Sequence, residues 1–233
     1  MSPSPIPMSL RTHKFFLLAV ALVVSYLLAP LASDASLAGT VLSLGWNACM
    51  AACAHSSDAS SRRRHLALGL FTAIALLELL SLWQVQLITD SVQGALSIAL
   101  LFLAVFTLFR DLLRAQRVGS EQICASIVLY LLIGIFYWVL YGLLARYELS
   151  PPAFHGVAPH PEAIVSIGER RSFDLLYFSF VSLTTVGYGD IVPVHPFART
   201  LATLEAVTGQ LYLALLVARL VSLQFTTPSS RAA

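Results

Sequence analysis

The 233-residue chain is 58% hydrophobic and only 11% charged, and its mean hydropathy is +0.80. Soluble globular domains are about half apolar and about a quarter charged, so this composition predicts an integral protein of the lipid bilayer. The formal net charge is +2, and Lys14 is the single lysine. The chain therefore lacks the broad basic surface that nucleic acid binding requires.

Six apolar runs are predicted to cross the membrane as helices. A spanning helix needs about 20 apolar residues, because lipid offers no partners for backbone polar groups. Breaks rich in proline, serine or charge separate the runs, which are residues 15–31, 37–54, 66–88, 92–109, 122–145 and 198–225. The intervening loop at 146–172 carries four prolines and cannot be helical throughout. The predicted fold class is an all-α membrane protein with six transmembrane helices.

The first apolar run has two interpretations. With "RTHK" before it and "LAPLASDA" after it, the run has the layout of a signal peptide with a small-residue cleavage site. It is longer than the apolar part of most signal peptides, so we expect an uncleaved helix. The topology of residues 37–233 is the same in either case.

The distribution of basic residues predicts the orientation, since cytoplasmic loops carry an excess of arginine and lysine. With the N-terminus inside, the basic residues on the cytoplasmic side are Arg11, Lys14, Arg62, Arg63, Arg64, Arg110, Arg114, Arg117, Arg219 and Arg231. The basic residues outside are Arg146, Arg170, Arg171 and Arg199. Both termini are therefore expected in the cytoplasm, with the loop 146–172 extracellular, in a multi-pass protein of the cell (plasma or inner) membrane.

The segment between the last two spans, "SFDLLYFSFVSLTTVGYGDIVPVHPF", is too short and too aromatic to be another span. Residues 173–184 predict a helix of about three turns that enters the membrane and stops partway, which is tolerated where protein surrounds it. Asp174 in its expected first turn suits the positive end of the helix dipole. The negative end near Thr184 would point to the membrane centre and favour a cation.

The motif "TTVGYGD" at 184–190 resembles the selectivity-filter signature of potassium channels. Tyr177 and Phe178 stand where that family often has paired aromatics, Pro193 follows the filter, and Gly209 lies at the family's usual distance from the filter tyrosine. The resemblance covers residues 120–225, the pore module of two helices and a loop. It implies a K⁺-selective channel and no cofactor other than the permeant ion.

The residue types of the motif suit this chemistry independently of the resemblance. A dehydrated K⁺ needs oxygens in place of water, and backbone carbonyls pointing one way supply them. Gly187 and Gly189 permit the backbone angles that this requires, and the Thr185 hydroxyl can add the innermost ligand. Val186 and Tyr188 are expected to point away from the axis toward the pore helix. The predicted K⁺ ligands are thus Thr185, Val186, Gly187, Tyr188 and Gly189, with the K⁺ positions at Thr185, Val186, Gly187 and Tyr188.

A glycine-rich turn between two helices is the alternative interpretation of "GYG". The preceding "TTV", the short helix, the following Asp190 and the downstream Gly209 together favour the filter. Asp190 at the outer mouth is expected to concentrate cations. One chain supplies one filter strand and a ring of carbonyls around an ion needs four, so a homotetramer is implied.

Gly209 in the last helix has two possible roles. The resemblance implies a hinge that lets the inner helices splay, and the alternative is close helix packing, which small residues permit in membranes. Helical spacing places Gln210, Leu213 and Val217 toward the same cavity as Gly209.

Two carboxylates, Glu78 and Glu205, lie at membrane depth, where ionisable residues are costly and usually face the protein interior. For Glu205 we expect a hydrogen bond that stabilises the back of the filter. For Glu78 we expect a carboxyl group that ties two helices together, with proton sensing as the alternative.

The first four helices do not match a typical voltage sensor. A sensor needs several arginines within the membrane, each worth about 2.3 kcal/mol per 100 mV, and the run 92–109 contains none. Arg110, Arg114 and Arg117 share a helix face but follow a run already long enough to span. The predicted organisation is a cytoplasmic N-terminus (1–14), a four-helix transmembrane module (15–109), a cytoplasmic linker (110–121), a pore domain (122–225) and a short cytoplasmic tail (226–233).

The remaining candidate groups do not indicate an enzyme. Cys49, Cys53 and Cys124 lie in apolar runs, where core packing is the expected role. His155 and His160 lie in the proline-broken loop, a poor scaffold for a metal site. The leading function is a K⁺ channel that is not gated by voltage. A regulatory membrane protein with a silent or secondary pore is the alternative, and a K⁺ uptake transporter is a weaker one because such chains typically carry four filter loops.

Overall fold

The computed structural model describes residues 14–28, 36–56, 61–81, 86–114, 120–146, 152–157 and 170–225. Within these ranges the chain forms seven helices and two short strands. They are α1 (Lys14–Leu28), α2 (Ser36–Ser56), α3 (Ser61–Ser81), α4 (Gln86–Arg114), α5 (Ser120–Arg146), β1 (Phe154–His155), α6 (Arg170–Leu183), β2 (Val192–Pro193) and α7 (Pro196–Phe225).

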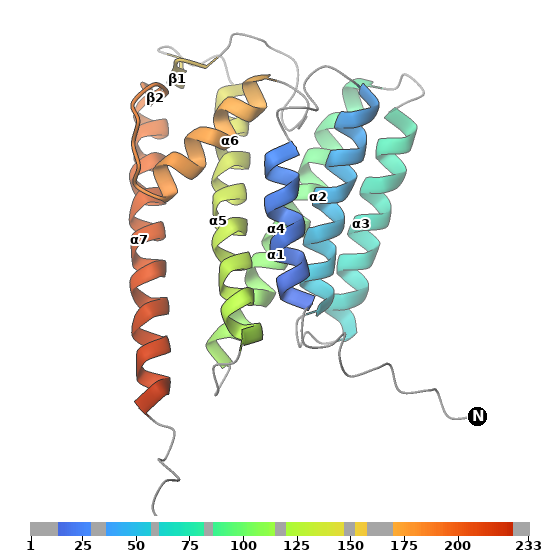
Figure 1. Ribbon diagram of the computed structural model, residues 1–233. Coiled ribbons are helices and arrows are strands. Elements are labelled where there is room, and N and C mark those ends of the chain that lie inside the picture. Colours follow the sequence, from blue (N-terminus) through green and yellow to red (C-terminus); the bar gives the residue numbers. More distant parts are fainter. Residues whose placement is uncertain are drawn as a thin grey trace, which may run out of the picture.

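The helices stand side by side, with α6 inclined between the upper ends of α5 and α7 (Figure 1). Helix α3 packs against α2 and α4, and α1 packs against α2 and α5. Helix α5 is the central element, since it also packs against α4, α6 and α7. The first turn of α1 and the last turn of α7 lie at one end of the bundle, while β1 and β2 lie at the other (Figure 1).

Three helices of the described part are long and apolar enough to cross a membrane: Val92–Arg114, Glu121–Ala145 and Pro196–Arg219. The helix Lys14–Leu28 and the segment Phe173–Leu183 are apolar but shorter. The all-helical membrane class therefore holds, and the count of six spans remains a prediction.

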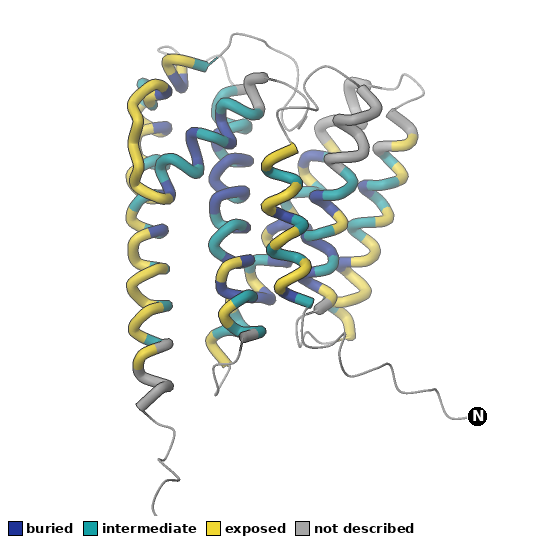
Figure 2. Tube along the Cα trace, viewed as in Figure 1, coloured by how far each residue is buried: buried dark blue, intermediate teal, exposed yellow. Residues whose placement is uncertain are grey.

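Burial differs sharply between α5 and α7, the two long helices of the C-terminal half. Helix α5 is buried or half-buried over nearly all of its length, and α7 is exposed over most of its length (Figure 2). The buried residues of α5 include Leu129, Leu132 and Ile135. Trp138 of the same helix packs on Trp46 of α2 with ring centroids 5.6 Å apart. In lipid an exposed leucine carries no penalty, so the apolar surface of α7 needs no cover for stability alone.

Two element boundaries differ from those expected. Helix α6 begins at Arg170 instead of 173, so Asp174 lies in the second turn and the proposed dipole contact in the first turn is wrong. The reason is that Arg170, Arg171 and Ser172 extend the helix by almost a turn. Helix α4 runs without a break through Arg110 to Arg114, past the expected linker boundary.

Candidate functional site

The segment 184–190 leaves the end of α6 with an alternating backbone. Thr185 has φ 57°, Gly187 has φ 58° and Gly189 has φ 81°, whereas Val186 and Tyr188 do not have positive φ. In an ordinary strand successive carbonyls point to opposite sides. Alternating the hand of the backbone turns every second peptide plane, so that successive carbonyls can face one side. Thr185 is a β-branched residue in the left-handed region, a genuine outlier that marks stored strain.

The base of this segment is fixed by hydrogen bonds to the last turn of α6. The Thr185 amide donates to the Ser182 carbonyl and the Val186 amide donates to the Val181 carbonyl, each at 3.0 Å. These contacts satisfy carbonyls that a helix end leaves without partners. The Leu183 carbonyl accepts from the Tyr130 hydroxyl of α5 at 3.2 Å. The end of α6 is therefore held by its own chain and by a neighbouring helix.

Every residue from 184 to 190 is exposed in the single chain. Tyr188 is 73% exposed but stacks on Tyr177 of α6, with centroids 6.4 Å apart and planes 3° apart. Val186, also expected to turn toward α6, is 52% exposed. Tyr177 hydrogen-bonds Asp190. The phenol can donate in this bond, and the carboxyl oxygen accepts.

A two-stranded ladder closes the outer end of the segment. Phe154 and His155 of β1 pair antiparallel with Pro193 and Val192 of β2. Phe154 is buried, and its ring packs edge-on against Tyr141 and Phe178 at 5.3 and 5.2 Å. Part of the loop 146–172 thus lies against residues 192–193, which proline content alone did not predict.

Gly156 follows β1 and touches the segment directly. A Cβ at this position would lie 2.3 Å from the Asp190 carbonyl oxygen, and φ is +91°. We expect Gly156→Ala to shift residues 189–191 and to lower the free energy of unfolding by at least about 1–2 kcal/mol, the cost of the left-handed backbone. Thermal unfolding of purified protein measures this, and Gly45→Ala in α2, whose Cβ would meet nothing within 4 Å, is the control. Equal melting temperatures for the two variants would contradict the expected clash between a Cβ at position 156 and the Asp190 carbonyl oxygen.

Gly209 lets α7 approach the end of α6. It is buried, and a Cβ there would lie 2.3 Å from the Leu183 carbonyl oxygen and 3.1 Å from Leu183 Cδ1. Helix α7 continues unbroken through this position. The geometry gives Gly209 a packing role of the kind small residues serve in membranes, and the hinge remains a prediction.

The two roles of Gly209 give different results for Gly209→Ala. If packing dominates, the added methyl group displaces the end of α6, and we expect a loss of about 1–3 kcal/mol, as for an overpacked core. Gly94→Ala in α4 is the matched control, because it is also buried but would meet nothing within 4 Å. A variant as stable as the control with its conduction blocked would support the hinge and contradict the packing role.

Glu205 of α7 is fully buried behind α6 and joins three helices. Its Oε2 accepts from the Tyr141 hydroxyl at 2.5 Å, and its Oε1 lies 2.5 Å from Ser179 Oγ. Ser179 Oγ also lies 2.7 Å from the Gly134 carbonyl oxygen. One hydroxyl proton cannot serve both the carboxyl group and the carbonyl. All the polar groups are satisfied together if the Glu205 carboxyl group is neutral and donates to Ser179.

Further polar contacts tie α5 to α7 along the same interface. Tyr212 donates to the Ser126 carbonyl at 2.7 Å, and its ring stacks on Tyr130 at 5.8 Å. Tyr137 and Thr208 exchange a hydrogen bond of 3.2 Å. Such contacts between helices are an alternative to unpaired polar groups in lipid.

The expected cavity residues lie below the filter segment on α7. Gln210 is exposed, and its Nε2 donates to Thr185 Oγ1 at 3.1 Å. Leu213 and Val217 are 39% and 58% exposed. Gln210 thus contacts Thr185, the first residue of the predicted filter, while Leu213 and Val217 leave an apolar surface further along α7.

Several expected candidates lie away from this region. The side chain of Glu78 and the residues Arg117 and His160 are outside the described part, and His155 is exposed on β1. The described residues include no cluster of three His, Cys, Asp or Glu side chains able to hold a metal. All three cysteines are free thiols.

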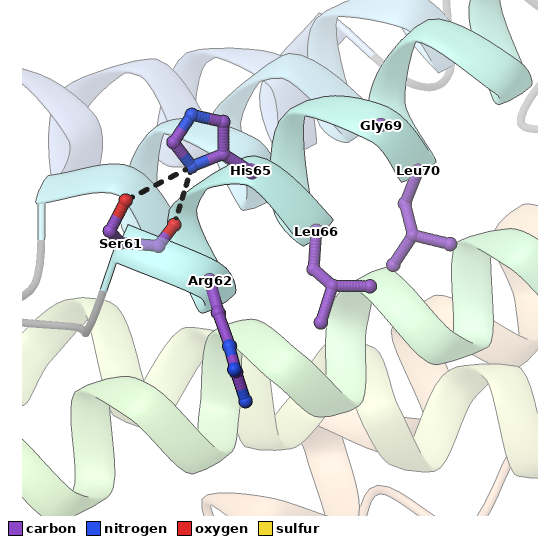
Figure 3. A pocket seen from close by; sticks show the side chains of 6 residues that line it. All are labelled: Ser61, Arg62, His65, Leu66, Gly69 and Leu70. Atoms are coloured by element: carbon purple, nitrogen blue, oxygen red, sulfur yellow. Dashed lines mark hydrogen bonds between the residues drawn. The ribbon is translucent and has the colours of Figure 1, made fainter.

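An open hollow of about 650 Å³ lies on α3, outside the pore region, and is lined by Ser61, Arg62, His65, Leu66, Gly69 and Leu70 (Figure 3). His65 Nδ1 folds back to the Ser61 carbonyl oxygen at 2.6 Å (Figure 3). The imidazole is thus already engaged within its own helix.

The residues that hold the end of α6 and the segment 184–190 were not predicted from sequence. Tyr130, Tyr141 and Ser179 look like ordinary members of apolar helices. A hydroxyl at membrane depth needs a partner, however, and on that ground Tyr141 and Ser179 could have been paired with Glu205. Gly156 and Phe154 lie in a loop whose fold depends on the distant β2, so no local signal identifies them.

Comparison with known proteins places the C-terminal part of the chain. Residues 127–225 match a family model described as an ion channel. The inward rectifier potassium channel Kirbac3.1 of Paramagnetospirillum magnetotacticum is 44% identical over 57 residues, which are 24% of this chain and 19% of that protein. A voltage-gated potassium channel of Aeropyrum pernix is 35% identical over 79 residues, 34% of this chain and 23% of that protein.

A third similar protein is the two pore potassium channel a of Oryza sativa subsp. japonica, 33% identical over 85 residues, 36% of this chain and 21% of that one. The chain thus spans about a fifth of the length of the curated relatives that it matches. No solved structure matches. Residues 127–225 are thus similar to an ion-channel family, which is not a family of enzymes.

Proposed function

We propose that the chain assembles as a homotetramer that conducts K⁺ passively across the membrane, because residues 127–225 match a family model described as an ion channel. The proposed filter is the segment Thr185, Val186, Gly187, Tyr188 and Gly189. The observation that carries the proposal is the alternating φ along this segment, with positive values at three of five positions. That alternation supports a column of carbonyl oxygens facing one axis.

Such a column suits K⁺ because the oxygens replace the hydration shell of the ion. Stacking of Tyr188 on Tyr177 resists inward or outward movement of the column, and Asp190 adds negative charge at its outer end. The three similar proteins are all named potassium channels, which favours K⁺ over other cations.

The exposed surfaces of the single chain support the proposed tetramer. Residues 184–190 are exposed in the single chain, although residues 184–187 donate backbone hydrogen bonds to α6. Irregular backbone at membrane depth is tolerated only within protein or along a water-filled cavity. Four copies around one axis would provide both. The exposed faces of α7, including Leu211 and Leu215, would then lie against lipid or neighbouring copies.

The proposal includes no voltage gating. The apolar run 92–109 carries no arginine, and Arg110 and Arg114 lie in the last two turns of α4. Arginines at the end of a helix are placed at the membrane surface rather than in the field. Proteoliposome recordings should accordingly show current that rises with driving force without a steep voltage threshold.

Flux through purified full-length protein tests the proposal. Liposomes loaded with K⁺ should exchange it with external K⁺ without an energy source, and Na⁺ in its place should give little flux. Native mass spectrometry of the same preparation should show a tetramer. Equal K⁺ and Na⁺ flux would overturn the selective filter, and a stable monomer that conducts would overturn the assembly. A tetramer that binds K⁺ but passes none would instead support the regulatory alternative.

A further inference from the structure

Gln210 of α7 contacts the inner end of the proposed filter, next to the position where α7 packs against the end of α6. The preceding residue, Gly209, packs against the Leu183 carbonyl with no room for a side chain. This contact fixes the position of α7 along its axis relative to α6, so the side chain of Gln210 reaches the inner end of the proposed filter. There Gln210 Nε2 lies 3.1 Å from Thr185 Oγ1 and donates to it.

The hydrogen bond changes what the Thr185 hydroxyl can offer an ion. A hydroxyl oxygen has two lone pairs, and the amide proton of Gln210 occupies one of them. Only the other lone pair remains for a cation, and the donor withdraws electron density from the same oxygen. The bond also anchors a β-branched residue at φ 57°, where an unanchored side chain would be free to relieve strain.

We propose that Gln210 sets the cation affinity of the innermost oxygen layer of the filter. This inference rests on the proposed function and deepens it. Conduction needs sites that attract an ion yet release it. By holding the Thr185 hydroxyl in place and engaging one of its lone pairs, Gln210 keeps the innermost site weak enough for ions to leave toward the cavity.

The side chain is well suited to this task. A carboxamide donates without carrying charge, so it does not repel an approaching cation as an ammonium or guanidinium group would. Gln210→Leu removes the donor at similar size. Gln210→Glu keeps the shape but replaces the donor with an acceptor. The Thr185 hydroxyl can then donate a hydrogen bond to the carboxylate, which leaves both of its lone pairs for the ion.

A double-mutant cycle with Ba²⁺ tests the proposal. Ba²⁺ has nearly the radius of K⁺ and fits the same oxygens, and its double charge holds it there. Calorimetry on the full-length purified protein measures its binding without requiring conduction. We expect Gln210→Leu to tighten Ba²⁺ binding about five- to tenfold, the scale of one hydrogen bond, and Gln210→Glu to tighten it further.

In a Thr185→Val background, which keeps the branched shape without the hydroxyl, Gln210→Leu should change Ba²⁺ affinity by less than about twofold. An equal change in both backgrounds, or no change in either, would overturn the proposal. If Thr185→Val does not assemble, the Rb⁺ to K⁺ permeability ratio of Gln210→Leu and Gln210→Glu decides. Ratios equal to that of the unaltered chain would refute the inference.

The proposed function and the role of Gln210 can be tested separately. If the unaltered chain neither binds Ba²⁺ nor passes K⁺, the proposed function itself is wrong. If it does both, and the Gln210 variants match it in Ba²⁺ affinity and permeability, only the role of Gln210 is wrong.

Discussion

Replacing Gly187 by alanine is expected to abolish K⁺-selective conduction while leaving the helices of each chain folded. Gly187 has φ 58°, and a Cβ there would meet nothing within 4 Å of the single chain. The cost is therefore conformational, about 1–2 kcal/mol for an L-residue in the left-handed region. A tetramer carries it four times around one axis, a total of about 4–8 kcal/mol that a shift of the carbonyls would relieve.

Two controls separate backbone strain from the mere addition of a methyl group. Gly69→Ala in α3 adds the same methyl group where nothing lies within 4 Å and the backbone is helical, so it should leave selectivity unchanged. D-alanine at position 187, introduced by chemical ligation, favours positive φ and should retain selectivity. A Gly187→Ala channel that still prefers K⁺ to Na⁺ as strongly as the unaltered chain would show that positive φ at this position is not what forms the filter.

Removal of the Glu205 carboxyl group is expected to have the second large effect. In Glu205→Ala the hydroxyls of Tyr141 and Ser179 lose the partner that joins α7 to α5 and α6. Each unsatisfied buried polar group costs about 1–3 kcal/mol, and the deleted side chain leaves a cavity besides. We expect the variant to melt well below the unaltered protein and to lose its tetramer in detergent.

Glu205→Gln is the matched control, because an amide can reproduce a neutral carboxyl group. Its Oε1 can accept from Tyr141 and its Nε2 can donate to Ser179, which then donates to the Gly134 carbonyl. Thermal unfolding of this variant should therefore lie close to that of the unaltered chain. If Glu205→Gln were as unstable as Glu205→Ala, the charge of an ionised carboxylate would be the stabilising element. The assignment of a neutral carboxyl group to Glu205 would then be wrong.

The pore region could be placed from sequence because its signals are local. A filter motif needs glycines at fixed spacing, and the short helix before it differs in length from a spanning helix. The predicted helix at 173–184 accordingly lies close to α6, Arg170–Leu183. Its start was missed because residues 170–172 are polar and appear to belong to the loop when hydrophobicity alone is considered.

The supports of the filter could not be placed because they depend on contacts between distant parts of the chain. The bond between Tyr141 and Glu205 joins residues 64 positions apart, and that between Tyr130 and Leu183 joins residues 53 apart. The buried position of Glu205 was foreseen from the cost of a carboxyl group in lipid, but its partners were not. For Gly209 both roles were foreseen, and only the 2.3 Å approach to Leu183 points to packing.

The most direct test of the central claim is the reversal potential of the purified protein in a planar bilayer, with K⁺ on one side and Na⁺ on the other. If residues 185–189 form a K⁺ filter, the current should reverse close to the K⁺ equilibrium value. A reversal potential near zero would mean that the pore passes both ions alike, and the claim that this segment selects K⁺ would be wrong.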